Sequence, residues 1–83
     1  MASKKLTPEA IEALIYHHDY LTYGTLTICV MTLNSGAMVT GESNVIDPNN
    51  YDAKIGREMA YKDAFAKIWQ LEGYAMKRDC TNW

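Results

Sequence analysis

The chain has 83 residues, which limits it to one small domain with a single thin core. Apolar residues make up 48% of the chain and charged residues 22%, a composition typical of a globular protein and not of a disordered one. Eight Lys and Arg against ten Asp and Glu give a net charge of −2, which argues against DNA- or RNA-binding proteins, because these are normally basic.

The first predicted element is a short amphipathic helix that begins after Thr7. Thr7 is a favourable N-cap, and Pro8 suits the first helical position because its missing N–H would have no partner there. Apolar side chains at helical spacing predict about three turns. The residues at this spacing are Ile11, Leu14, Ile15 and His18.

A β-hairpin is predicted next. Residues 22–33 are rich in β-branched side chains and carry no charge, residues 34–36 form a turn in which Gly36 can take positive φ, and residues 37–43 return as a second strand. Alternation places Leu26, Ile28 and Val30 on one face and Cys29, Met31 and Leu33 on the other. Because both faces are at least partly apolar, one short helix cannot cover them and a second cover is required.

A long helix is predicted over residues 51–71, capped by Asp47 or Asn50 and ending at Gly73. Its small residues Gly56, Ala60 and Ala64 recur every four positions, which suits packing on a sheet or against a twin helix. Trp69 is expected in the core, and residues 74–77 are a candidate third strand. Residues 1–83 are therefore predicted to form a single α+β domain.

Motifs for catalysis and metal binding are absent from the sequence. His17 and His18 are adjacent, so on a helix they would point about 100° apart and could not share a metal. Cys29 reads as a core residue and Cys80 as an exposed one, and two cysteines are too few for a secreted disulfide framework. We expect no catalytic residue, no metal and no cofactor.

Targeting signals are also absent. Glu9 and Glu12 interrupt the region in which a signal peptide would be apolar, and the apolar run at residues 28–31 is too short to cross a bilayer. The expected location is the cytoplasm, with no membrane partner.

Aromatic and cationic side chains are interleaved in the C-terminal half. Such a mixture can be a core with a solvated basic face, or a nucleotide pocket in which rings stack on bases and cations bind phosphates. The aromatic residues are Tyr51, Tyr61, Trp69 and Tyr74, and the cations are Lys54, Arg57, Lys62, Lys67, Lys77 and Arg78.

A resemblance to a known protein family lies in three segments, residues 41–43, 50–57 and 64–74. Their aromatic-Asp pair, Ile-Gly-Arg and Trp-x-x-Glu-Gly-Tyr resemble the family of small phage proteins named after gene product 49 of phage N4 and gene 66 of phage Sf6. The same arrangement is more faintly similar to the first group of Thoeris anti-defence proteins. That resemblance implies a sponge that sequesters cyclic nucleotide messengers, including cyclic ADP-ribose isomers, without degrading them in the infected bacterial cell.

The resemblance also implies a pocket between protomers, made by an aromatic residue and arginines. Tyr51 matches an aromatic position and Arg78 a pocket arginine, whereas Arg57 belongs to the shared Ile-Gly-Arg motif. The ligand-binding candidates are Tyr51, Arg57, Lys62 and Arg78. A homodimer or higher homo-oligomer is expected, and the alternative function is a protein–protein interaction module that acts on a host or phage protein.

Overall fold

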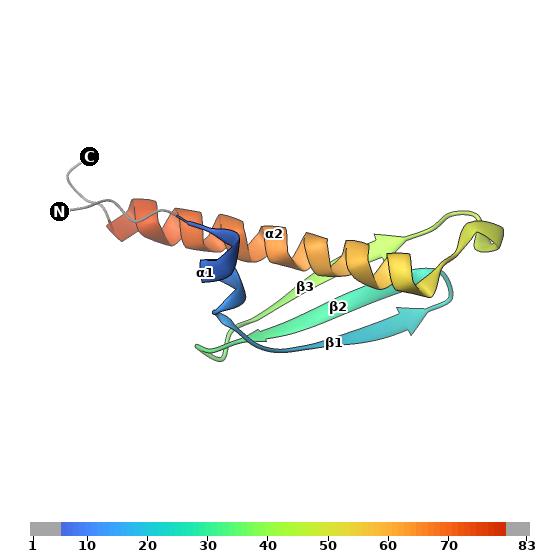
Figure 1. Ribbon diagram of the computed structural model, residues 1–83, viewed down its shortest axis with the longest axis horizontal. Coiled ribbons are helices and arrows are strands. Elements are labelled where there is room, and N and C mark those ends of the chain that lie inside the picture. Colours follow the sequence, from blue (N-terminus) through green and yellow to red (C-terminus); the bar gives the residue numbers. More distant parts are fainter. Residues whose placement is uncertain (1–5, 80–83) are drawn as a thin grey trace.

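A computed structural model describes residues 6–79 as a three-stranded antiparallel sheet with one long helix across one of its faces (Figure 1). The sheet order follows the chain order, β1-β2-β3, so two hairpins build it. This architecture confirms the predicted α+β class. The elements are α1 (Pro8–Glu12), β1 (Ile15–Tyr23), β2 (Leu26–Leu33), β3 (Met38–Asn44), the short 3-10 helix η1 (Pro48–Asn50) and α2 (Ala53–Asp79).

The N-terminal helix is shorter than predicted. Its start is confirmed, because the Thr7 hydroxyl accepts a hydrogen bond from the backbone N–H of Ala10 at 3.1 Å and Pro8 follows. It ends at Glu12, and the predicted helical continuation to His18 is wrong, since Ile15–Tyr23 is a strand. This segment is rich in tyrosine and pairs with β2 along its length, so cross-strand pairing prevails over the weak helical pattern.

The hairpin prediction holds for β2 and β3 and needs one correction. Residues 22–33 do not form one strand, because Gly24 adopts φ +59° in a tight turn that separates β1 from β2. The second turn is confirmed, with Gly36 at φ +92°. Both positions lie in the left-handed region that glycine enters without strain.

The long helix is confirmed, but it continues to Asp79. Gly73 lies inside α2 with negative φ, so the predicted helix end at Gly73 and the third strand over residues 74–77 are both wrong. The third strand of the sheet is β1 instead. Asp52 is the residue that caps α2, because its Oδ1 accepts from the backbone N–H of Lys54 at 2.9 Å, whereas Asp47 caps η1 by accepting from Asn49 at 3.0 Å.

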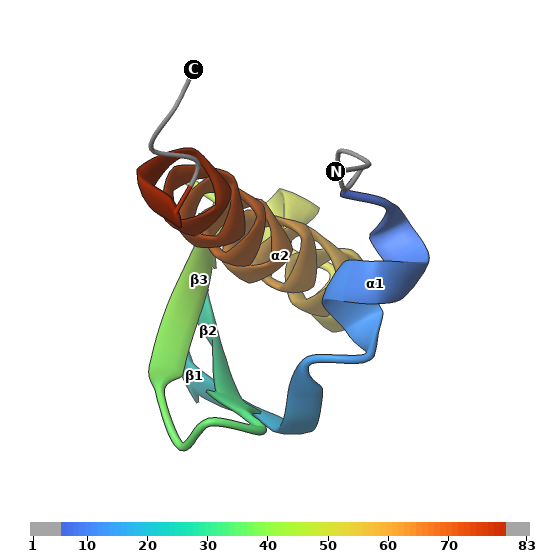
Figure 2. The same ribbon diagram turned by 90° about the vertical axis from the view of Figure 1, so that its left-hand side faces the viewer.

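The core lies between α2 and the inner face of the sheet, with α1 beside it (Figure 2). The closest approach is at Gly41 of β3, where an added Cβ would lie 2.2 Å from the backbone oxygen of Ala60 and from the backbone nitrogen of Ala64. The small residues of α2 therefore pack on the sheet of their own chain. The fully buried apolar residues are Ile11, Cys29, Met31, Ala60, Ala64 and Ile68.

Three side-chain expectations have clear outcomes. The core position of Cys29 is confirmed. The prediction that Trp69 lies in the core is wrong, because 36% of this residue is exposed to solvent. His17 and His18 lie on a strand, so they point to opposite faces of the sheet and not to neighbouring directions on a helix. Cys80 lies outside the described residues.

Candidate functional site

A groove runs along one side of α2, and Tyr20 of β1 lines the part of it near the N-terminal end of that helix. α2 packs on β3 and β2, and this leaves the inner face of β1 without the helix directly above it (Figure 2). The strand register places Tyr20 opposite the buried Cys29, so the Tyr20 side chain faces the same side of the sheet as α2. We call this hollow the α2–β1 groove; its lining residues are Tyr20, Lys54, Arg57, Glu58, Tyr61, Lys62, Phe65, Ala66, Trp69 and Gln70.

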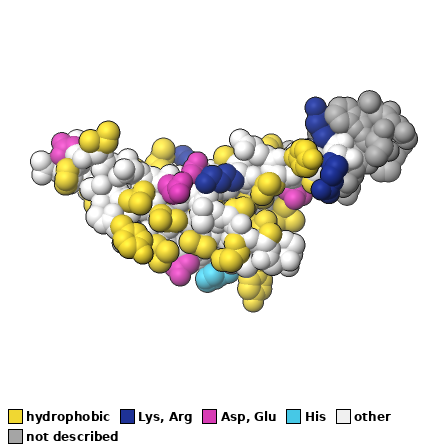
Figure 3. All heavy atoms as spheres, turned by 180° about the vertical axis from the view of Figure 1, so that it is seen from behind, with side chains coloured by type: hydrophobic (Ala, Val, Ile, Leu, Met, Phe, Trp, Pro, Cys, Tyr) yellow, Lys and Arg dark blue, Asp and Glu magenta, His cyan; other side chains and the backbone are white. Residues whose placement is uncertain are grey.

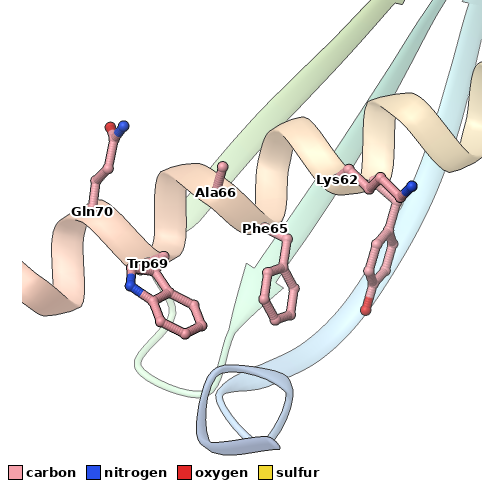
Figure 4. A pocket seen from close by; sticks show the side chains of 6 residues that line it. Lys62, Phe65, Ala66, Trp69 and Gln70 are labelled. Atoms are coloured by element: carbon pink, nitrogen blue, oxygen red, sulfur yellow. The ribbon is translucent and has the colours of Figure 1, made fainter. Parts of the chain in front are cut away.

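The wall of the groove on α2 is aromatic. Tyr61, Phe65 and Trp69 follow one another at a spacing of four residues, which aligns them along one side of a helix. Phe65 and Trp69 project from the same side of α2, in the direction of α1 (Figure 4). The Tyr61 and Phe65 rings lie nearly parallel with centroids 6.1 Å apart. This part of the groove has a volume of about 600 Å³ and is lined by Tyr61, Lys62, Phe65, Ala66, Trp69 and Gln70.

Towards the N-terminal end of α2 the groove becomes basic. This second part has a volume of about 320 Å³ and shares Tyr61 and Lys62 with the aromatic part, so the two are continuous. Three cations and one carboxylate give the basic end a local charge of +2, which favours an anionic ligand. The lining residues are Tyr20, Lys54, Arg57, Glu58, Tyr61 and Lys62.

The tyrosines of the groove are held as neutral phenols. Burial is the largest cause that raises the pKa of Tyr20 and of Tyr61 above the ordinary value of 10.0. His18 packs edge-on against both rings, with centroids 5.6 Å from Tyr20 and 5.3 Å from Tyr61. Near neutral pH both groups are neutral phenols, and their rings are held in place by neighbouring side chains.

The predicted binding residues do not all meet in one chain. Arg57 and Lys62 both line the basic end of the groove. Tyr51 precedes α2 and is half-buried beside Gly56, outside the set of residues that lines the groove. Arg78 lies twenty-one residues beyond Arg57 on the same helix, about 32 Å away, with its guanidinium carbon 6.0 Å from the centre of the Tyr74 ring.

Sequence reasoning overlooked Tyr20, Lys54 and Phe65 as site residues. The aromatic wall had a detectable signal, since the i, i+4 spacing of Tyr61, Phe65 and Trp69 is visible in the sequence beside Lys62. Tyr20 had no such signal, because it fell between the predicted helix, which reached His18, and the predicted strand over residues 22–33. Its place in the groove depends on the pairing of β1 with β2.

Residues 6–79 lack two other types of site. No three His, Cys, Asp or Glu side chains in this range come together in a way that could hold a metal ion. None of the helices in the same range is long and apolar enough to cross a membrane.

Comparison with known proteins identifies a family. The model of the family described as "Phage protein (N4 Gp49/phage Sf6 gene 66) family" matches residues 6–80, nearly the whole chain. The match includes every residue that lines the α2–β1 groove. No curated protein and no solved structure matches.

Proposed function

The chain belongs to the phage protein (N4 Gp49/phage Sf6 gene 66) family, and from this premise we propose that it is an anti-defence protein that sequesters a cyclic nucleotide messenger of the host. The proposed site is the α2–β1 groove. The messenger is bound and withheld without being cleaved, so the effect depends on affinity and on the amount of protein made.

The observation that carries this proposal is the contact between an aromatic and a cationic surface in one groove. A nucleotide presents flat bases and charged phosphates, and it needs a stacking surface next to cations. Arg57 and Lys62, with Lys54 beside them, supply the phosphate contacts. Tyr61 lines both the basic and the aromatic part, and this shared position supports a role in which its ring stacks on a base while its neighbours hold a phosphate.

The test is isothermal titration calorimetry with a panel of cyclic nucleotides that includes cyclic ADP-ribose isomers and cyclic dinucleotides. Charge-assisted contacts to phosphate contribute about 1.5–3 kcal/mol, so Arg57→Ala and Lys62→Ala should each weaken binding roughly tenfold to a hundredfold. Mass spectrometry should recover the bound nucleotide unchanged. Absence of binding by the parent protein, or recovery of a cleaved product, would contradict the proposal.

Two matched controls make the titration specific to the groove. Lys67 lies on the β3 side of α2, with its Nζ 3.8 Å from carboxylate oxygens of Glu42 and Asp63, so Lys67→Ala removes a cation from the same helix but not from the groove. Arg78→Ala removes a cation about 32 Å from Arg57. Both variants should bind like the parent. A loss of binding in Arg78→Ala alone would instead place the ligand between copies of the chain.

A second candidate function, a protein–protein interaction module, is favoured by the apolar end of the groove. Phe65, Ala66 and Trp69 line an open hollow without a charged side chain at that end, which suits an apolar segment of another protein. Under this alternative, no nucleotide binds, and Trp69→Ala abolishes capture of a host or phage protein whereas Arg57→Ala does not. Nucleotide binding that depends on Arg57 would exclude it.

A further inference from the structure

The outer face of the sheet, which points away from α2, is apolar at its centre. Because opposite residues in an antiparallel pair share a face, the register assigns alternate residues of all three strands to it. Three of its apolar side chains are largely exposed: Leu21 at 49%, Tyr23 at 68% and Met38 at 62%. The apolar residues of this face are Leu21, Tyr23, Leu26, Ile28, Val30 and Met38.

Within residues 6–79 no element covers this face. α1 and α2 both lie on the inner side of the sheet (Figure 2). Seen from behind, hydrophobic side chains gather over the lower part of the molecule, where the strands lie (Figure 3). Exposed apolar areas of this kind in a small protein mark an interaction surface.

We infer that a second copy of this chain packs on the outer face, sheet against sheet, in a two-fold symmetric dimer. Three strands about 4.8 Å apart and about eight residues long span roughly 14 Å by 26 Å. Two such faces have a flat area of about 730 Å², and because side chains make the surface uneven the accessible area buried is larger, about 1,000 Å² in total. That area is near the lower limit for a specific interface, so the sheet face is just large enough to hold a dimer together.

The charges on this face also fit a second copy. They lie on the outer strands, Asp19 on β1 and Glu42 on β3, and leave the middle strand β2 with apolar and uncharged side chains. Glu42 occupies an outer-face position on the edge strand, and its carboxylate reaches round that edge to lie 3.8 Å from Lys67 Nζ on α2, away from the centre of the face. An uncharged centre with a charged rim is the usual anatomy of an interface between proteins.

Extension of the sheet through the edge of β1 is the less favourable arrangement. The Asp19 carboxylate accepts a hydrogen bond from the backbone N–H of Tyr20 at 2.8 Å, so it occupies a backbone donor of this edge strand. The strand also has a bulge between Ile15 and His17. Both features are typical of edges that are protected from pairing with another chain. The face, and not the edge, is therefore the dimer surface.

This dimer leaves both α2–β1 grooves open, because they lie on the opposite side of each sheet. It does not depend on the proposed function, and nucleotide binding neither supports nor contradicts it.

The experiment is sedimentation equilibrium over a wide concentration range. The parent protein should fit twice the chain mass of 9.4 kDa. A symmetric interface carries each substitution twice, so Leu21→Glu and Met38→Glu should each raise the dimer dissociation constant by roughly a hundredfold. The control is Ile55→Glu, which places the same charge on α2 at a residue that is 55% exposed, and it should leave the dimer intact.

Two results would overturn the inference: a parent that stays monomeric throughout the concentration range, or a dimer that Ile55→Glu dissociates while Leu21→Glu does not. Circular dichroism checks that each variant is folded. If the glutamate variants do not fold, the double variant Leu21→Thr/Met38→Thr keeps a strand-forming side chain at both positions, and it should still weaken the dimer.

Discussion

The two faces of β2 come from the same eight residues and have different surroundings. On the inner face Thr27, Cys29 and Met31 are fully buried beneath α2. On the outer face, residues 26, 28 and 30 are all aliphatic but only half-buried. Both faces look alike in the sequence, so hydrophobicity alone does not tell which one meets the helix.

The difference lies in the size of the side chains on the neighbouring strand. On the inner face β3 has Gly41, and without a side chain there the backbone of α2 can touch the strand. On the outer face the neighbouring residues of β3, such as Thr40, have side chains, so a partner cannot approach the strand backbone as closely there. The inner face is therefore built for a helix of the same chain, and the outer face for a separate surface.

The largest expected effect on stability comes from adding a side chain at Gly41, where the helix touches the sheet. Gly41→Ala should destabilise the protein by at least about 3 kcal/mol, because the new Cβ meets backbone atoms of Ala60 and Ala64 at 2.2 Å and the helix must move away. Urea denaturation followed by circular dichroism measures the change. An unfolding free energy equal to that of the parent would show that the helix does not approach the sheet at this point.

The second prediction compares the faces directly with one substitution on each. Met31→Ala should lower the unfolding free energy by about 2–5 kcal/mol at every protein concentration, because it leaves a cavity in the core of one chain. Ile28→Ala should cost about 1 kcal/mol when the protein is dilute, since Ile28 is half-buried. Its cost should grow with protein concentration if a second copy covers the outer face, whereas a concentration-independent cost would contradict that.

The third prediction concerns alkaline pH. Burial raises the pKa of Tyr20 and Tyr61 above 10.0, so the unfolded chain ionises first and folding stability is complete below pH 10.0. As the pH rises through the folded-state pKa values, this contribution is lost and the melting temperature should fall. Tyr61→Phe removes one ionising group and should make the fall shallower. A melting temperature that is constant or rises above pH 10.0 would be inconsistent with buried phenols.

The smallest expected effect is a gain in stability. Gly73 lies inside α2, and the nearest atom to an added Cβ is Leu6 Cδ1 at 3.9 Å, an ordinary contact. Gly73→Ala should stabilise the protein by about 0.5–1 kcal/mol, because alanine loses less backbone freedom in a helix. The same chemical change thus has opposite signs at Gly41 and Gly73. A loss of stability at Gly73 would mean that the helix ends there, as the sequence suggests.

The sequence by itself determined the features that depend on neighbouring residues. The Thr7 cap, the turn at Gly36, the alternation along β2 and the long helix with small residues on one side are all local patterns. Half of the predicted site was also within reach of local reasoning, because Arg57 and Lys62 lie five residues apart on the same helix. Such patterns specify their structure through hydrogen bonds and dihedral preferences within a few residues.

Only the tertiary structure decided the rest. Residues 15–23 became a strand because β2 was available to pair with them, and α2 continued through Gly73 because residues 74–79 contain no proline or further glycine that would stop a helix. The α2–β1 groove exists because the backbone contact at Gly41 holds the helix over β3 and away from β1. Contacts of this kind join residues far apart in the chain, so no local pattern contains them, and the place of Tyr20 beside Tyr61 follows from packing alone.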